Sequence, residues 1–167
     1  MKKLLVVLAI VLFGMSNMKA QEANGLIKVN PIGFIFGVFN ATYEKPLNES
    51  SSISLGASFF NWKSLNISGL GLSAEYRFYF SNNSEAPHGM FAAPVLEFNS
   101  MSYDGYTEKE SLLAIGGGVK AGHQWVWDSG VALDLYFGYG YMSAKFDHYD
   151  ATGGYPMLGL AIGYAFQ

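Results

Sequence analysis

A two-residue alternation between apolar side chains and small or polar ones is the feature that most constrains what this chain can fold into. Between residues 68 and 80, one face carries Leu70, Leu72, Ala74, Tyr76, Phe78 and Phe80, and the other carries Gly69, Gly71, Ser73, Glu75, Arg77 and Tyr79. Such alternation predicts a β-strand, because successive side chains of a strand point to opposite faces. Beyond the first 20 residues, no segment sustains a helical period and none has 18 consecutive apolar residues. Neither a helical bundle nor a membrane-spanning helix fits this pattern.

The alternation recurs in six clear segments, which we expect to be strands. They are residues 52–60, 68–80, 90–99, 113–125, 131–141 and 158–166. Segments rich in turn residues separate them, at 45–51, 62–66, 81–89, 103–110, 128–130 and 146–154. The remaining residues 26–44 supply either one long strand or two short strands joined near 31–37. Two are favoured, because an even total of eight places both ends of the mature chain on one side of a closed antiparallel barrel.

The composition of the second face indicates which surroundings the barrel meets. In a soluble barrel the face opposite the apolar one meets water and is dense in Lys and Glu. Here that face is mostly Gly, Ala and Ser, and only 14% of the chain is charged, against about 25% in an ordinary soluble domain. Small residues suit a narrow interior, whereas Leu, Ile, Val and aromatic residues suit hydrocarbon. The pattern therefore predicts an all-β fold, an antiparallel up-and-down transmembrane β-barrel of eight strands with inverted polarity.

Aromatic residues fall toward the two ends of the expected strands. If the chain ends on the periplasmic side, one rim receives Tyr43, Tyr76, Phe78, Phe80, Trp125, Trp127, Tyr164 and Phe166, and the other receives Phe59, Trp62, Phe98, Tyr139 and Tyr141. Amphipathic rings at both rims are typical of the aromatic girdles of membrane barrels. The turn at 128–130 is then periplasmic, and the loops at 103–110 and 146–154 are external.

The first 20 residues predict export. Lys2 and Lys3 precede an apolar run over residues 4–13, and small or polar residues follow up to Ala20. This is the layout of a secretory signal peptide, and the run is shorter than the roughly 20 residues of a membrane-spanning helix. We expect residues 1–20 to be a signal peptide and residues 21–167 to be the barrel domain, localised in the bacterial outer membrane. Without the leader, seven basic residues remain against 13 acidic ones, which argues against nucleic acid as a partner.

The leader, the lipid-type alternation and the terminal run 158–166 carry a resemblance. Over residues 25–167 the chain resembles the small eight-stranded outer-membrane β-barrel proteins of bacteria, of OmpA- or OmpX-type architecture. The aromatic-ended last strand is similar to the one that the barrel-assembly machinery recognises, although Gln167 follows Phe166. Residues 29–33 and 39–44 also look like a family of uncharacterised exported barrels with an unassigned domain. The resemblance implies outer-membrane lipid, lipopolysaccharide and the assembly machinery as partners, and it implies no activity.

Six charged residues fall on the expected inner face: Glu44, Glu75, Arg77, Glu97, Lys120 and Asp134. Eight strands leave a lumen only wide enough for side chains, so these charges are expected to pair in a plugging ionic network. Arg77 is the expected centre, because a guanidinium can hold two carboxylate oxygens at once. A gated ion path and a catalytic set are the alternatives for the same residues.

The expected external loops are acidic and rich in tyrosine. Their candidate contact residues are Tyr103, Asp104, Tyr106, Asp147, His148, Tyr149 and Asp150. Tyrosine supplies rigid amphipathic contact area, and carboxylates can meet divalent ions that bridge lipid phosphates. These loops are either simply hydrated or a contact surface for a host molecule, another envelope protein or lipopolysaccharide.

No motif in the sequence specifies a reaction. There is no spaced metal-binding pair, and Gly116 to Gly118 lack the residues of a phosphate loop, so we interpret them as a bend or bulge. We expect no cofactor, no metal and no catalytic residues, and a non-enzymatic structural or surface-interaction role. Two alternatives stay open. One is a lipid A-modifying enzyme using Ser143, His148 and an acid, and the other is a secreted lipocalin-like carrier of an apolar ligand.

Overall fold

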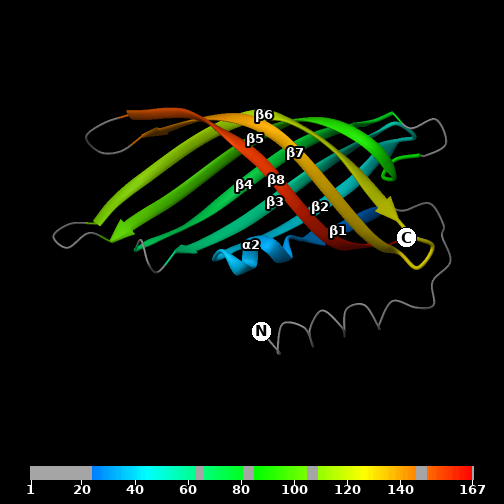
Figure 1. Ribbon diagram of the computed structural model, residues 1–167, viewed down its shortest axis with the longest axis horizontal. Coiled ribbons are helices and arrows are strands. Elements are labelled where there is room, and N and C mark those ends of the chain that lie inside the picture. The colour runs from blue at the N-terminus through cyan, green and yellow to red at the C-terminus, as the bar shows by residue number, and fades with distance from the viewer. Residues whose placement is uncertain (1–23, 63–65, 81–84, 105–108, 146–149, 167) are drawn as a thin grey trace.

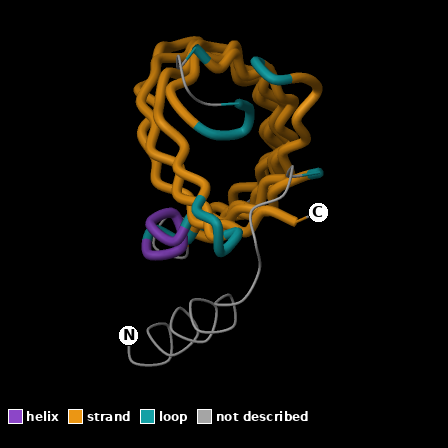
Figure 2. Tube along the Cα trace, turned by 90° about the vertical axis from the view of Figure 1, so that its right-hand side faces the viewer, coloured by secondary structure: helices purple, strands orange, loops and turns teal. Residues whose placement is uncertain are grey.

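The strands close into a ring in chain order. The computed structural model describes residues 24–62, 66–80, 85–104, 109–145 and 150–166, so the expected signal peptide lies outside the described residues. Its elements are β1 (Gly25–Val29), α2 (Pro31–Ile35), β2 (Val38–Asn48), β3 (Ser51–Trp62), β4 (Ile67–Tyr79), β5 (Gly89–Asp104), β6 (Lys109–Val126), β7 (Val131–Lys145) and β8 (Asp150–Phe166). Each strand pairs antiparallel with the next, and β8 pairs with β1 (Figures 1 and 2). The predicted all-β antiparallel barrel of eight strands is confirmed.

Residues 26–44 form two strands, as favoured above, and the short helix α2 separates them. Asn30 caps this helix, since its side-chain Oδ1 accepts a hydrogen bond from the Gly33 N–H at 2.9 Å. Pro31 occupies the first turn, where a missing N–H costs nothing. Gly37 then turns the chain with a positive φ of 75°. The helix was not predicted, because five residues are too few to show a helical period. In the part of the chain that is described, no helix has the length and apolar character needed to cross a membrane.

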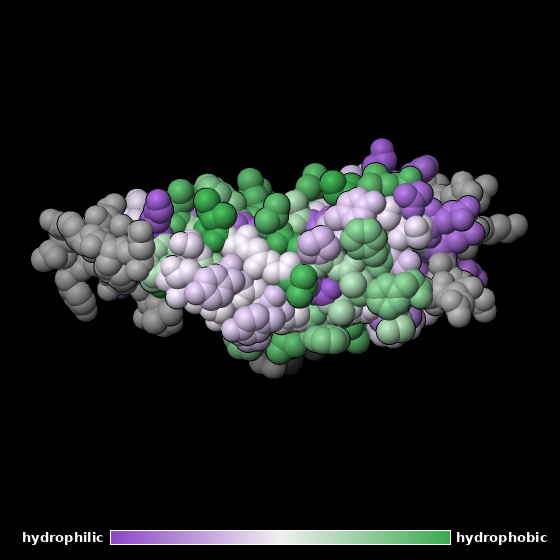
Figure 3. All heavy atoms as spheres, turned by 90° about the horizontal axis from the view of Figure 1, so that it is seen from above, coloured by the Kyte–Doolittle hydropathy of each residue, from purple (hydrophilic) through white to green (hydrophobic). Residues whose placement is uncertain are grey.

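The polarity of the barrel is inverted. On the outer face Leu70 and Leu72 expose 64% and 62% of their surface, whereas Glu75 exposes 7% and Asp134 only 1%. Hydrophobic side chains extend along much of the visible outer face, and strongly hydrophilic residues gather near one of its ends (Figure 3). The apolar members of the predicted alternation therefore point outward, and the small and charged members point into the lumen.

The second half of the barrel is longer than the first. Strands β5 to β8 contain 16, 18, 15 and 17 residues, against 5, 11, 12 and 13 in β1 to β4. The predicted loop bounds 103–110 and 146–154 are wrong, because β5 continues to Asp104, β6 begins at Lys109 and β8 begins at Asp150. Backbone pairing continues there without an apolar alternation to reveal it: the start of β8 reads Asp-Ala-Thr-Gly-Gly.

The glycine run in β6 does not produce a bulge. Gly116, Gly117 and Gly118 pair in unbroken register with both β5 and β7, so the bulge of the predicted bend or bulge is wrong. The inward Gly118 instead permits close packing, since a Cβ built there would lie 2.5 Å from the backbone oxygen of Tyr139 and 2.9 Å from the side chain of Met157.

Substitution of Gly118 tests this packing. Gly118→Ala is expected to lower the free energy of unfolding by about 1–3 kcal/mol, because the added methyl overlaps a backbone atom that cannot rotate away. Gly153→Ala is the control, since a Cβ there meets nothing within 4 Å. Urea unfolding of the folded barrel in detergent measures both. Equal midpoints for the two variants would contradict the close approach.

Candidate functional site

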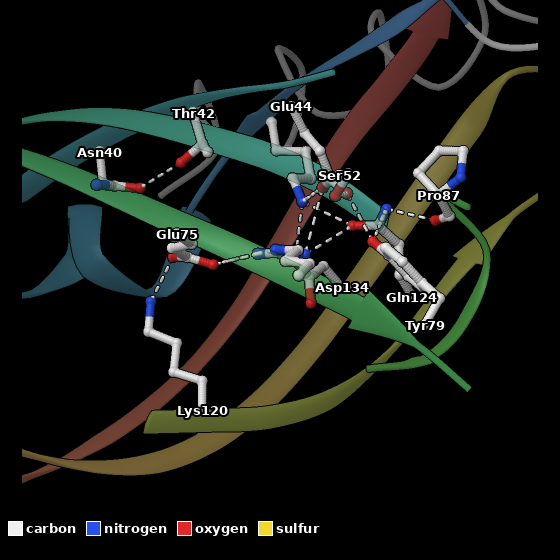
Figure 4. Close-up of polar contacts among 12 residues, drawn as sticks. Asn40, Thr42, Glu44, Ser52, Glu75, Tyr79, Pro87, Lys120, Gln124 and Asp134 are labelled. Atoms are coloured by element: carbon white, nitrogen blue, oxygen red, sulfur yellow. Dashed lines mark hydrogen bonds and ion pairs between the residues drawn. The ribbon is translucent and has the colours of Figure 1, made fainter. Parts of the chain in front are cut away.

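Inward-facing polar side chains from five strands meet inside the barrel. We call this group the lumen network. Its charged members are Lys28 (β1), Glu44 (β2), Glu75 and Arg77 (β4), Lys120 (β6) and Asp134 (β7), and their exposed fractions do not exceed 8% (Figure 4). Each points inward because it alternates with apolar residues that face outward. The structure therefore brings together five of the six charges predicted to share the lumen, and it adds Lys28.

Arg77 lies at the centre of the lumen network. Its Nε and Nη2 donate to one oxygen of Glu75 at 3.0 and 2.9 Å. Its Nη1 donates to Asp134 at 2.7 Å and lies 3.3 Å from Glu44. The guanidinium also stacks 4.3 Å from the ring centre of Phe91. One cation thus contacts three carboxylates, a geometry that the planar guanidinium makes possible.

Lys28 is a second centre that the sequence reasoning missed. Its Nζ donates to Glu44 at 2.5 Å, to the Gln124 side-chain oxygen at 2.6 Å and to Asp134 at 2.9 Å. All three ammonium hydrogens are used in this way. The alternation that places Lys28 inside was present in the sequence, since it stands between Ile27 and Val29, which both face outward. Without assigned strand limits in residues 26–44, its face could not be determined.

Glu97 lies inside the barrel, but it stands apart from the cations. Its Oε2 accepts a hydrogen bond of 2.6 Å from the Tyr155 hydroxyl, which crosses from β8 to β5. Lys120 instead donates to Glu75 at 2.6 Å and lies over the ring of Tyr136. The Tyr155 side chain reaches Glu97 because β8 begins at Asp150, so that Tyr155 is already part of the strand.

The segment before β5 closes the end of the barrel at which β8 ends. The Gln124 side-chain nitrogen donates to the backbone oxygen of Pro87 at 2.5 Å, and the Ala86 N–H donates to the Glu49 oxygen at 2.7 Å. The Tyr79 hydroxyl donates to Glu44 at 2.6 Å and accepts from the same Gln124 nitrogen at 3.2 Å, so it connects Gln124 to the lumen network. Figure 2 shows a loop lying across the ring.

A polar cavity of about 90 Å³ remains beside the lumen network. Its wall includes Asp134, whose Oδ1 has no hydrogen-bond partner among the described residues, although its Oδ2 accepts from both Lys28 and Arg77. The space is far below the volume of a small-molecule pocket, which is about 300–1,000 Å³. Within the described ranges, no group of three His, Cys, Asp or Glu residues is arranged to hold a metal ion.

Of the seven candidate contact residues in the expected external loops, three lie within the described residues. Tyr103 and Asp104 are the last residues of β5, and Asp150 is the first of β8. Four others, Tyr106, Asp147, His148 and Tyr149, lie outside the described residues. Ser143, the possible nucleophile of the enzyme alternative, is exposed on β7, and its proposed partner His148 is among those four.

The chain matches a sequence family described as "Protein of unknown function (DUF3575)", over residues 5–165. No curated protein and no solved structure matches the chain.

Removal of the Arg77 charge tests the lumen network. Arg77→Met is expected to lower the free energy of unfolding by about 3–5 kcal/mol, because Glu44, Glu75 and Asp134 stay buried after losing their shared cation. Lys45→Met is the matched control, since Lys45 is an exposed cation on β2. Guanidinium-induced unfolding in detergent measures the difference. If Arg77→Met unfolds at the same midpoint as Lys45→Met, the network does not stabilise the barrel.

Proposed function

This chain belongs to the DUF3575 family of proteins of unknown function, and from that premise we propose that it is an outer-membrane β-barrel of the bacterial cell envelope. Residues 1–20 are the signal peptide that directs export, and residues 21–167 form the barrel. Its architecture is that of the small OmpA- and OmpX-type barrels. Phe166, the last residue of β8, suits recognition by the barrel-assembly machinery.

The inverted polarity is the observation that carries this proposal. Large apolar side chains such as Leu96, Val119 and Leu158 expose 69%, 63% and 75% of their surface. A soluble monomer rarely exposes contiguous apolar patches beyond a few hundred Å². A lipid environment removes the free-energy cost of exposing these apolar side chains to water. A closed barrel also satisfies the backbone hydrogen bonds that lipid cannot. The charged lumen also gives no support to a carrier of an apolar ligand.

The proposed role is non-enzymatic, either structural or in surface interaction. The lumen network and the Tyr155–Glu97 hydrogen bond occupy the interior that a diffusion channel would need. The long strands β5 to β8 exceed the roughly 9–11 residues that cross the hydrocarbon, so they carry the chain beyond it. Lipopolysaccharide and other surface molecules are the partners that this projecting part would meet.

Cell fractionation and gel mobility test the location. The chain is expected in the membrane fraction, to require detergent for release, and to migrate differently before and after boiling, because a closed barrel resists unfolding in detergent. Recovery in the soluble fraction without detergent would support a secreted carrier and contradict the proposal. Unchanged mobility on boiling would argue against a stable barrel.

A charge on the outer face tests the surroundings. Leu72→Arg is expected to lower the stability of the barrel in a lipid bilayer by about 2–4 kcal/mol, the cost of an arginine near the midplane. Ser68→Arg, near the end of β4, is the control and is expected to have a much smaller effect. Unfolding from vesicles measures both. If Leu72→Arg instead leaves stability unchanged and improves solubility in water, the outer face does not meet lipid.

A further inference from the structure

A group of aromatic nitrogen donors lies on the outer face, at the end of the barrel where β8 ends. His123 and Trp125 alternate with the inward Gln124 on β6, and their ring centres lie 4.2 Å apart. The ring centre of His88, the residue just before β5, lies 6.1 Å from that of His123. All three side chains are half-buried. We call His88, His123 and Trp125 the donor cluster.

Every member of the donor cluster carries an N–H group that the rest of the described chain leaves unpaired. The Val126 N–H donates to Nδ1 of His88 at 3.1 Å, so the proton of a neutral His88 ring is on Nε2. His123 has one ring N–H when neutral, and the indole of Trp125 has one. None of these three N–H groups has a hydrogen-bond partner within the described ranges. Three donors side by side favour a ligand with several acceptor oxygens.

An apolar groove of about 450 Å³ adjoins the donor cluster on the outer face. Its outward lining residues are Phe80, Met90, Ala121, His123, Leu135 and Phe137. His123 belongs to both the groove and the cluster, and its neighbours in register on β5 and β7 are Met90 and Leu135. The next outward position of β6 is Ala121, whose small side chain leaves the groove open toward the middle of the strand. Polar donors and an apolar groove thus share one wall, as the binding of an amphiphile requires.

A second groove shows that apolar shape alone does not set the first one apart. It has about 470 Å³, and its outward lining residues are Leu55, Leu72, Ala74, Leu96, Phe98 and Ile115. None of these six side chains carries a hydrogen-bond donor, and none belongs to the donor cluster. The first groove therefore differs in the polar head of the ligand that it can hold, and the second groove provides an internal control.

The donor cluster and the first groove follow each other along the barrel in the order of the parts of a phospholipid. Trp125 and the exposed Trp127 mark the membrane interface, because indole rings favour the level of the lipid head groups. The donor cluster lies at that level, and the groove continues from it toward the middle of the strands, where acyl chains lie. A phosphate offers charged acceptor oxygens at the head of such a chain, and hydrogen bonds to charged acceptors are the strong ones.

The charges nearest to the cluster along the chain decide the kind of head group. Glu85 precedes His88 by three residues and Asp128 follows Trp125 by three, and both are exposed. Segments 85–90 and 121–130 contain no lysine or arginine. A purely anionic head group meets repulsion there, whereas a zwitterionic head group places its ammonium near the carboxylates.

We propose that the donor cluster and the first groove together bind one phospholipid with a zwitterionic head group, from the leaflet that faces the periplasm. The phosphate oxygens accept hydrogen bonds from His88, His123 and Trp125, and one acyl chain lies in the groove. This inference rests on the proposed membrane location, because the ligand is a lipid of the membrane that surrounds the barrel.

Three probes with acyl chains of equal length test the head group. Dilauroyl phosphatidylethanolamine, dilauroylglycerol and dodecanoate are added at neutral pH to the full chain, folded in a non-ionic detergent, and native mass spectrometry counts the retained molecules. The phospholipid is expected to saturate at one molecule per barrel. The other two are expected to bind at least tenfold more weakly, because one lacks the phosphate and the other has a purely anionic head. Retention of either one at the level of the phospholipid, or no saturable binding of the phospholipid, would overturn the proposal.

Filling each groove in turn tests the place of binding. Ala121→Phe fills the first groove and is expected to weaken phosphatidylethanolamine binding at least tenfold, whereas Ala74→Phe fills the second groove and is expected to leave it unchanged. Equal binding by the two variants would overturn the site. Each barrel is first checked by its heat-dependent gel mobility, so loss of binding by a folded barrel is distinct from a failure of the membrane location, which fractionation tests.

Removal of the donors tests the head-group contact and does not depend on the folding of Ala121→Phe. His123→Phe combined with Trp125→Phe keeps both aromatic rings but removes two N–H groups. This double variant is expected to bind phosphatidylethanolamine at least tenfold more weakly and dilauroylglycerol as before. Tyr139→Phe is the control, since it removes a hydroxyl from an exposed side chain on β7 outside the cluster. If the double variant binds the phospholipid as tightly as Tyr139→Phe does, the donors do not hold the phosphate and the proposal is overturned.

Discussion

The barrel depends on the pairing of charge inside a space too narrow to hold water around each ion. Glu44, Glu75 and Asp134 are buried, and a buried carboxylate without a partner costs several kcal/mol, on the order of its desolvation penalty. Arg77 and Lys28 offset that cost by binding the same carboxylates from two strands. The network thereby ties β1, β2, β4, β6 and β7 together across the lumen. Because the charged groups are paired inside the barrel, the outer face can be apolar.

Much of this architecture could be predicted from the sequence, because period-two alternation fixes which side chains share a face. Glu75 and Arg77 could be placed inside by the neighbouring Leu72 and Phe78, which face outward. Lys28 was missed, since five residues of β1 give too short an alternation to set its limits. The end of β5 and the beginning of β8 were missed for another reason. Backbone pairing extends these strands beyond the apolar part of the outer face. Hydrogen bonds between backbones do not require any particular pattern of side chains, so the sequence does not reveal them.

The shortness of β1 also explains why Lys28 matters. This strand provides the only pairing described between β8 and the first half of the barrel, over five residue pairs. Its one inward cation, Lys28, bonds to residues of β2, β6 and β7 and so connects the two halves of the barrel from inside. Beyond Val29 the chain leaves the sheet, and Asn30, Pro31 and the helix α2 follow.

The proposed membrane location requires that the apolar face of the barrel meets hydrocarbon. The chain contains no cysteine, so a nitroxide can be attached at a single introduced site, Leu72→Cys or Leu135→Cys, and studied by electron paramagnetic resonance in lipid vesicles. We expect strong relaxation of the nitroxide by oxygen, which concentrates in the bilayer, and weak relaxation by a water-soluble nickel chelate. The reverse order at both positions would show that this face meets water and would rule out the membrane location.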